Sequence, residues 1–168
     1  MKKTLLMLAA GIAVLLGTSA CGGGSDEPTE PATATYIVNL SPDALSAGTY
    51  IVYYKDANNT TKFEVISTSS WSKTVSSTRF PAMFGFKIKA SPENETALTK
   101  DSYDLSVVGT IKMTRGAASV TNAPLNYSAT VEKHNVERAI ESNINNAVVA
   151  YNFSADGNAT VNNKMSFD

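Results

Sequence analysis

The chain has 168 residues, which suits one domain of ordinary size rather than two. Its single cysteine excludes an internal disulfide, and its single histidine excludes a metal site built from several histidines. The formal net charge of -1 lacks the basic excess of a nucleic-acid-binding domain, so we expect no nucleic-acid partner. Hydrophobic residues make up 43% of the chain, which is enough for a packed core.

The N-terminus has the three parts of a secretory signal peptide. Lys2 and Lys3 give a positive start, residues 5–17 are uncharged and mostly apolar, and small residues follow at 18–20. The apolar run is too short for a membrane-spanning helix, which needs about 20 residues. We therefore expect residues 1–20 to be removed, and the loss of two lysines shifts the formal net charge from -1 to -3.

Cys21 directly follows the small residues. The segment Thr18-Ser19-Ala20-Cys21 resembles a bacterial lipobox, although Thr18 stands where that motif usually has Leu. The resemblance implies that Cys21 receives a diacylglycerol, that the peptide is cut before it, and that the new N-terminus is acylated. The alternative is a soluble secreted protein whose cysteine has no such role. We expect the membrane to be a partner through this N-terminal lipid anchor, because each buried CH₂ group contributes about 0.8 kcal/mol.

Residues 21–32 have the composition of a flexible tether, with glycines, prolines and acids but no hydrophobic periodicity. The eleven residues after Cys21 span at most roughly 35 Å when extended. Asp26 and Glu27 resemble the acidic export signal of lipoproteins carried to the outer face of the outer membrane; the alternative is a solvated acidic linker. We expect outer-membrane anchoring, with the periplasmic and the cell-surface leaflet both left open.

Apolar residues recur at alternate positions from residue 33 to residue 168. The sequence predicts strands at residues 36–40, 50–54, 63–65, 71–75, 84–90, 103–113, 125–131, 149–153 and 160–161, with a last edge strand at Met165 and Phe167. Turn residues at 56–60 and the Asp156-Gly157 pair predict hairpins. A three-to-four-residue spacing predicts one short helix at residues 135–143.

The clearest amphipathic strand places Phe84, Phe86 and Ile88 on one face and Lys87 and Lys89 on the other. Many short strands joined by turns predict an all-β fold, an antiparallel immunoglobulin-like β-sandwich with one short helix, over residues 33–168. The alternative is a calycin-like barrel, which pairs its first and last strands around an apolar cavity and carries a small molecule.

Three segments within residues 36–90 carry a family resemblance: the strand 50–54, the turn 56–60 and Trp71-Ser72-Lys73-Thr74-Val75. On these the region resembles the extracytoplasmic β-sandwich of the MmpS-like transport-accessory family. Ser69-Ser70 stand where that family usually has Leu-Pro, and the family's cysteines are missing. The resemblance implies an immunoglobulin-like sandwich, and it adds transport accessory of an envelope complex as a further alternative for the function.

Few side chains suggest chemistry. His134 lies between Glu132 and Glu137, but zinc prefers more nitrogen or sulfur ligands than this segment offers, so we expect a surface histidine and no metal cofactor. Glu93 and Glu95 are neighbours in a polar loop rather than carboxylates facing each other across a cleft. We therefore expect neither catalytic residues nor a cofactor.

Residues Asp56, Asn58 and Thr60 place oxygens at alternate positions, as calcium loops do. The sharp-turn glycine and the closing bidentate glutamate of such a loop are missing, so we expect an ordinary turn. The segment around Asp156 and Asn158 receives the same interpretation.

Six aromatic residues cluster early in the folded region: Tyr36, Tyr50, Tyr53, Tyr54, Phe63 and Trp71. Sugar-binding modules stack aromatic rings on pyranose faces, but sandwich cores also need large aromatic side chains. The strand 50–54 is apolar on both faces, which is typical of a central strand, so the prediction places these aromatics in the core. The sequence as a whole predicts a lipid-anchored, non-enzymatic protein that acts in binding or assembly, with a glycan or a protein as partner.

Replacing Cys21 by serine tests the anchor. We expect Cys21→Ser to abolish acylation, because this thiol is the single attachment point in the chain. Metabolic labelling with a palmitate analogue measures the change. Label retained in full by the variant would contradict the predicted anchor.

Overall fold

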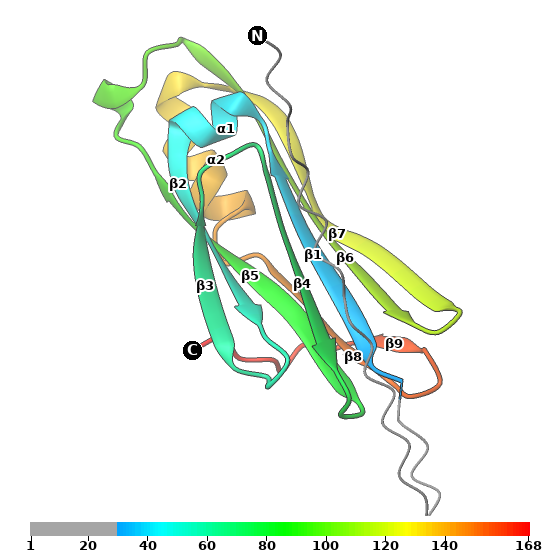
Figure 1. Ribbon diagram of the computed structural model, residues 1–168. Helices are drawn as coiled ribbons and strands as arrows, with labels where there is room; N and C mark the ends of the chain where they lie inside the picture. Colours follow the sequence, from blue (N-terminus) through cyan, green and yellow to red (C-terminus); the bar gives the residue numbers. More distant parts are fainter. Residues whose placement is uncertain (1–29) are drawn as a thin grey trace, which may run out of the picture.

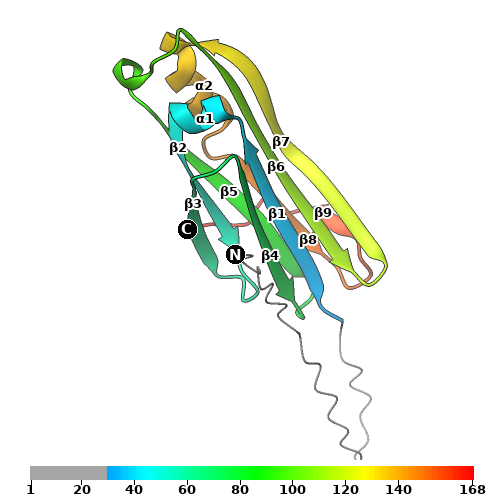
Figure 2. The same cartoon turned by 45° about the horizontal axis from the view of Figure 1, so that its top comes forward.

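The computed structural model describes residues 30–168, which form two antiparallel sheets packed face to face (Figures 1 and 2). The four-stranded sheet has the spatial order β4 (Ser70–Ser77), β1 (Ala32–Leu40), β6 (Ser102–Arg115), β7 (Ala118–Glu132). The five-stranded sheet has the order β3 (Thr61–Ile66), β2 (Gly48–Lys55), β5 (Ala82–Pro92), β8 (Val148–Phe153), β9 (Ala159–Val161). The predicted all-β, antiparallel sandwich is confirmed, because the described strands form two separate sheets rather than a closed barrel.

Short helices lie at one end of the sandwich (Figure 2). They are α1 (Pro42–Ala47), α2 (Val136–Asn143) and the 3-10 turns η1 (Glu95–Ala97) and η2 (Lys133–Asn135). The prediction of α2 is confirmed, whereas α1 was not predicted. Ser41 caps α1 by accepting a hydrogen bond from the Ala44 N–H at 3.1 Å, with proline as the first helical residue. Within residues 30–168, no helix is long and apolar enough to span a membrane.

Alternate strand residues from both sheets fill the space between them. Phe84, Phe86 and Ile88 of β5 are buried, as the alternation predicts, and Lys87 and Lys89 point to the other face of the sheet. The rings of Phe86 and Tyr36 meet edge to face across the core, with centroids 5.9 Å apart. Within residues 30–168, the space between the two sheets is therefore filled by apolar side chains.

The prediction of a last edge strand at Met165 and Phe167 is wrong. The edge beside β8 is already taken by β9, and residues 162–168 instead cross the outer face of the five-stranded sheet toward β3 (Figure 1, red). Phe167 is buried there, with 7% of its surface exposed. An added Cβ at Gly85 would come within 2.7 Å of the Val149 carbonyl oxygen of β8 and 2.8 Å of the Met165 Sδ, so the neighbouring strand together with the crossing segment leaves room only for glycine.

The Tyr36 hydroxyl joins the two sheets. The pairing of β2 with β5 ends at Tyr54 and Phe86, and the next opposing residues along the ladder are Lys55 and Gly85. Tyr36, which comes from β1 in the other sheet, donates a hydrogen bond to the Lys55 carbonyl at 3.0 Å and accepts one from the Gly85 N–H at 3.2 Å. Burial raises the pKa of this hydroxyl above its usual value, so it stays protonated and able to donate. The Tyr36 hydroxyl therefore takes the place of a backbone hydrogen bond between β2 and β5, and the two strands are no longer paired beyond this point.

Glu64 links the edge strands β3 and β4, which belong to different sheets, by hydrogen bonds. Its Oε1 accepts hydrogen bonds from the Lys73 ammonium at 2.7 Å and the Tyr54 hydroxyl at 2.9 Å, and its Oε2 accepts one from the Trp71 indole N–H at 2.9 Å. Lys73 and Trp71 belong to one sheet, and Tyr54 and Glu64 to the other. Lys73, followed by Trp71, holds the pKa of the Glu64 carboxyl below its usual range. The cluster fixes the position of β3 relative to β4.

Two tyrosine-to-phenylalanine changes test the role of the Tyr36 hydroxyl. We expect Tyr36→Phe to lower the free energy of unfolding by about 1–3 kcal/mol, because it leaves a buried N–H and a buried carbonyl unpaired. The matched control is Tyr50→Phe, since the Tyr50 hydroxyl is buried without a hydrogen-bond partner in the described structure. Its removal should leave stability unchanged or raise it. Urea denaturation measures both, and equal losses would contradict the role given to Tyr36.

The depressed pKa of Glu64 predicts a pH-dependent contribution to stability. The contribution is present above the unfolded-state pKa of about 4.3 and is lost as the pH falls through the lower native value. We expect Glu64→Gln to lower the free energy of unfolding by about 0.5–1.5 kcal/mol at pH 7, since water screens this partly exposed group.

Urea denaturation at pH 7 and again in acid compares Glu64→Gln with wild type. The difference should shrink in acid, where wild-type Glu64 is also neutral. Glu141→Gln, at an exposed position of α2, is the matched control. A stability difference that is the same at both pH values would contradict the ionic role of Glu64.

Candidate functional site

The outer face of the five-stranded sheet carries exposed apolar side chains. Phe63 and Val65 of β3 are 66% and 56% exposed, although large apolar side chains are usually covered. In the sheet register, Tyr53 of β2 lies between Phe63 and Lys87, and Ile51 lies between Val65 and Lys89. Two rows thus run across β3, β2 and β5, each with apolar side chains followed by a lysine.

These rows border a hollow of about 500 Å³. We call it the aromatic–lysine hollow; its lining residues are Tyr53, Thr60, Thr61, Phe63, Lys87, Lys89, Asn146, Phe167 and Asp168. The Tyr53 and Phe63 rings lie side by side, with centroids 5.8 Å apart and planes inclined at 37°. Hydroxyl and amide groups of Thr60, Thr61 and Asn146 add hydrogen-bonding capacity at its rim. The hollow combines aromatic surface, positive charge and neutral polar groups.

Positive charge dominates this face. Neither Lys87 nor Lys89 forms an ion pair within residues 30–168, and Asp168 is the one carboxylate among the lining residues. Lys55 lies next to Tyr53 on the same face, 9% exposed, with its ammonium 2.9 Å from the Thr61 Oγ1 and 5.6 Å from the centre of the Phe167 ring. The described structure gives Lys55 no carboxylate partner either. An anionic group in the hollow would therefore be attracted by the field of three lysines, which outnumber the opposing Asp168 side chain.

The turn at residues 56–60 brings the two aromatic rings together. The Asp56 Oδ1 accepts hydrogen bonds from the N–H groups of Asn58 and Thr60, both at 2.9 Å, and Asn59 adopts a left-handed conformation with φ of 61°. The turn fixes the hairpin register that sets Phe63 opposite Tyr53. The alternate oxygens predicted to form an ordinary turn do so: the Asp56 carboxylate is bonded to backbone N–H groups.

The other carboxylates and His134 are dispersed over the molecule. His134 is exposed in η2, with its Nδ1 3.6 Å from Glu132, and the described residues contain no group of three or more His, Cys, Asp or Glu side chains placed to hold a metal ion. Glu93 and Glu95 form no ion pair within the described range. Asp156 accepts a hydrogen bond from the Asn158 side chain at 2.7 Å within its own turn.

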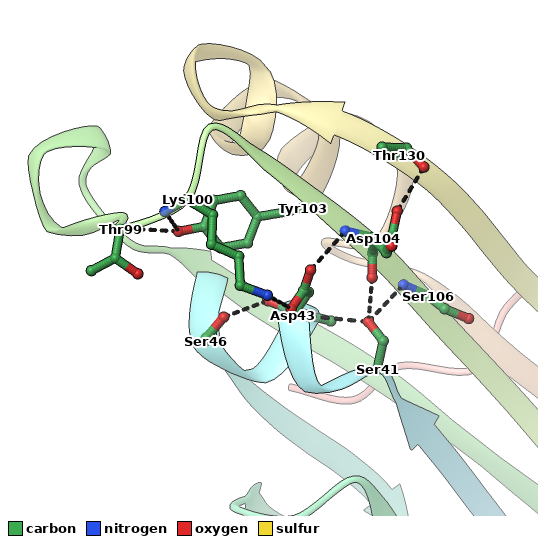
Figure 3. Close-up of polar contacts among 10 residues, drawn as sticks. Ser41, Asp43, Ser46, Thr99, Lys100, Tyr103, Asp104, Ser106 and Thr130 are labelled. Atoms are coloured by element: carbon green, nitrogen blue, oxygen red, sulfur yellow. Dashed lines mark hydrogen bonds and ion pairs between the residues drawn. The ribbon is translucent and has the colours of Figure 1, made fainter.

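A polar cluster joins α1 to β6 at the helical end of the sandwich (Figure 3). The Asp43 carboxylate accepts hydrogen bonds from the Lys100 ammonium and, at 3.0 Å, from the Asp104 N–H. The Ser41 hydroxyl donates to the Asp104 carbonyl at 2.7 Å and accepts from the Ser106 N–H at 3.0 Å. Lys100 lowers the pKa of Asp43, which keeps the carboxyl ionised. Ser41 and Asp43 both bond to β6, so the cluster attaches α1 to that strand.

The aromatic residues divide between the core and the hollow. The prediction of core positions is confirmed for four of them, which are buried: Tyr36, Tyr50, Tyr54 and Trp71. It is wrong for Tyr53 and Phe63, because the second face of β2 is only partly covered by residues 162–168. The sequence does indicate the face on which these two residues lie. Strand alternation and the hairpin turn together place Tyr53 and Phe63 on one face of the sheet and Tyr54 on the other. The lipidation residue Cys21 lies outside the described residues.

Comparison of the chain with protein-family models, with curated proteins and with solved structures finds no match. The aromatic–lysine hollow is thus assigned from its own residues on the broad side of the sandwich. They are the exposed Phe63 ring beside the half-buried Tyr53 ring, two lysines without ion-pair partners within residues 30–168, and a polar rim.

Proposed function

We propose that this protein is a lipid-anchored, non-enzymatic protein of the bacterial outer membrane or cell surface that binds a ligand through the aromatic–lysine hollow. The observation that carries the proposal is the pairing of the exposed Phe63 ring with the half-buried Tyr53 ring, beside two lysines without ion-pair partners in the described structure. Apolar surface bordered by polar groups is typical of binding sites. A ligand would cover the rings and supply the missing counter-charge.

The attachment of the chain supports this arrangement. The domain begins at the end of the sandwich opposite α1, where the Arg115 Nε donates a hydrogen bond to the Glu30 carbonyl at 3.0 Å. The Arg115 guanidinium also lies 4.6 Å from the centre of the Phe80 ring. An anchor at Cys21 would hold this end near the bilayer. The hollow lies on the broad side of the sandwich and would stay accessible.

The charged clusters support a role without catalysis. Asp43, Glu64 and Asp156 all have pKa values below their usual range because neighbouring donors hydrogen-bond to the ionised carboxylate. A general acid at neutral pH needs the opposite shift. These carboxylates act as hydrogen-bond acceptors within the fold.

Replacing Phe63 by alanine tests the binding role of the hollow. The Cys21→Ser protein, which lacks the acylation site and so cannot sediment through a lipid anchor, is incubated with outer-membrane material from cells lacking the gene, and the sedimented fraction is measured with and without the second substitution. We expect Phe63→Ala to weaken this association about tenfold, since it removes one of two central aromatic contacts. The variant should keep its melting temperature because the ring is 66% exposed.

The matched control is Val161→Ala. Val161 is 64% exposed and lies on β9, at the opposite edge of the same sheet. Its replacement should leave the association unchanged. Equal association of the Phe63 and Val161 variants would contradict a binding role for the hollow.

A further inference from the structure

We infer that the ligand of the aromatic–lysine hollow is an acidic carbohydrate, whose sugar rings lie against Tyr53 and Phe63 and whose carboxylates bind Lys87 and Lys89. The inference rests on the proposed function and adds to it the chemical class of the ligand. Three properties of the hollow support it: paired aromatic rings, two lysines in a row on one strand, and a rim of hydroxyl and amide groups.

The aromatic pair suits a ligand made of successive rings. A pyranose ring has an apolar C–H face that packs against an aromatic ring, and its edge carries hydroxyl groups. Tyr53 and Phe63 lie 5.8 Å apart at inclined angles, so they offer two adjoining surfaces rather than one enclosed slot. A fatty acid would need a closed apolar cavity, and the described core is filled with side chains. The hollow is open, polar at its rim and bordered by aromatic rings.

The lysines point to repeated negative charge. Lys87 and Lys89 are two residues apart on β5, which sets their Cα atoms about 7 Å apart along the strand. Both lie on the outer face, opposite Tyr53 and Ile51. A lysine ammonium is a mobile point charge, so it accepts carboxylates over a range of positions without the fixed geometry that arginine demands. A chain with a carboxylate on more than one sugar would pair with both.

The neutral rim distinguishes a carbohydrate from a purely ionic ligand. Thr60, Thr61 and Asn146 offer hydroxyl and amide groups that both donate and accept hydrogen bonds. The Thr61 Oγ1 already accepts a hydrogen bond from Lys55, which leaves its own O–H able to donate outward. Sugar hydroxyls need partners of both kinds. An acidic peptide would pair with the lysines but would leave the aromatic pair with little to contact.

Isothermal titration of the full-length protein tests the inference. The acidic probes are a galacturonate trisaccharide and a hyaluronan tetrasaccharide; the comparison probes are the neutral galactose trisaccharide and a polyglutamate peptide. We expect at least one acidic probe to bind about tenfold or more tightly than both comparison probes, and we expect its affinity to fall as salt is raised. Failure of both acidic probes to bind would overturn the inference, as would equal binding of the neutral trisaccharide.

Substitutions in the hollow test whether the acidic probe binds there. We expect the affinity for the acidic probe to fall about tenfold in the double variant Lys87→Gln/Lys89→Gln. We expect a similar fall in the single variant Phe63→Ala. Lys112→Gln, at an exposed position of β6 in the other sheet, is the matched control and should bind as wild type does. Melting temperatures of all variants establish that each is folded. If polyglutamate bound more tightly than the acidic saccharides, and Phe63→Ala did not change its affinity, the lysines would instead bind an acidic protein partner.

The two proposals fail in different ways. If neither acidic probe binds while outer-membrane association still depends on Phe63, the hollow binds a ligand of another class and only the carbohydrate assignment falls. If the association does not depend on Phe63, the proposed function itself is wrong.

Discussion

The structure depends on one buried hydroxyl. The Tyr36 side chain extends from a central strand of one sheet to the other sheet. There its hydroxyl forms hydrogen bonds with the Lys55 carbonyl and the Gly85 N–H, two backbone groups that lie just beyond the last paired residues of β2 and β5. Backbone polar groups buried without partners are destabilising, so the hydroxyl of Tyr36 stabilises this arrangement of the two sheets. The relative placement of the sheets is thus set by a hydrogen bond as well as by packing.

The covered part of the outer face lies next to this hydroxyl. β2 and β5 stop pairing beyond Tyr54 and Phe86, and Met165 of the crossing segment lies over Gly85, the neighbour of Phe86 on β5. The crossing segment ends beside Tyr53, where Phe167 and Asp168 line the hollow, and it leaves Phe63 exposed. The hollow therefore lies at the boundary between the covered and the uncovered part of one sheet.

Strand positions and core faces could be predicted from the sequence because alternation is a local property. Phe84, Phe86 and Ile88 were assigned to the core on their spacing alone, and α2 on its three-to-four-residue period. The six-residue α1 is too short to show a period, although Ser41 followed by Pro42 is a helix-start signal.

The contacts that create the candidate site join residues far apart in the sequence. Tyr36 bonds to a residue 49 positions away, and whether Tyr53 is buried depends on the path of residues 162–168. The spacing of apolar residues around Tyr53 is the same whether residues 162–168 cover this side chain or not. The face of Tyr53 and Phe63 was therefore predictable from alternation, but their exposure was not.

The position of β1 has a mechanical consequence. The proposed tether would enter the domain at the start of β1, a strand that pairs with β4 on one side and with β6 on the other. Tension applied through the tether pulls β1 lengthwise, so the hydrogen bonds on both flanks are loaded together in shear rather than opened one after another. The Tyr36 hydroxyl carries part of that load into the other sheet, because it bonds the Lys55 carbonyl of β2 and the Gly85 N–H of β5, two of the strands that carry the hollow.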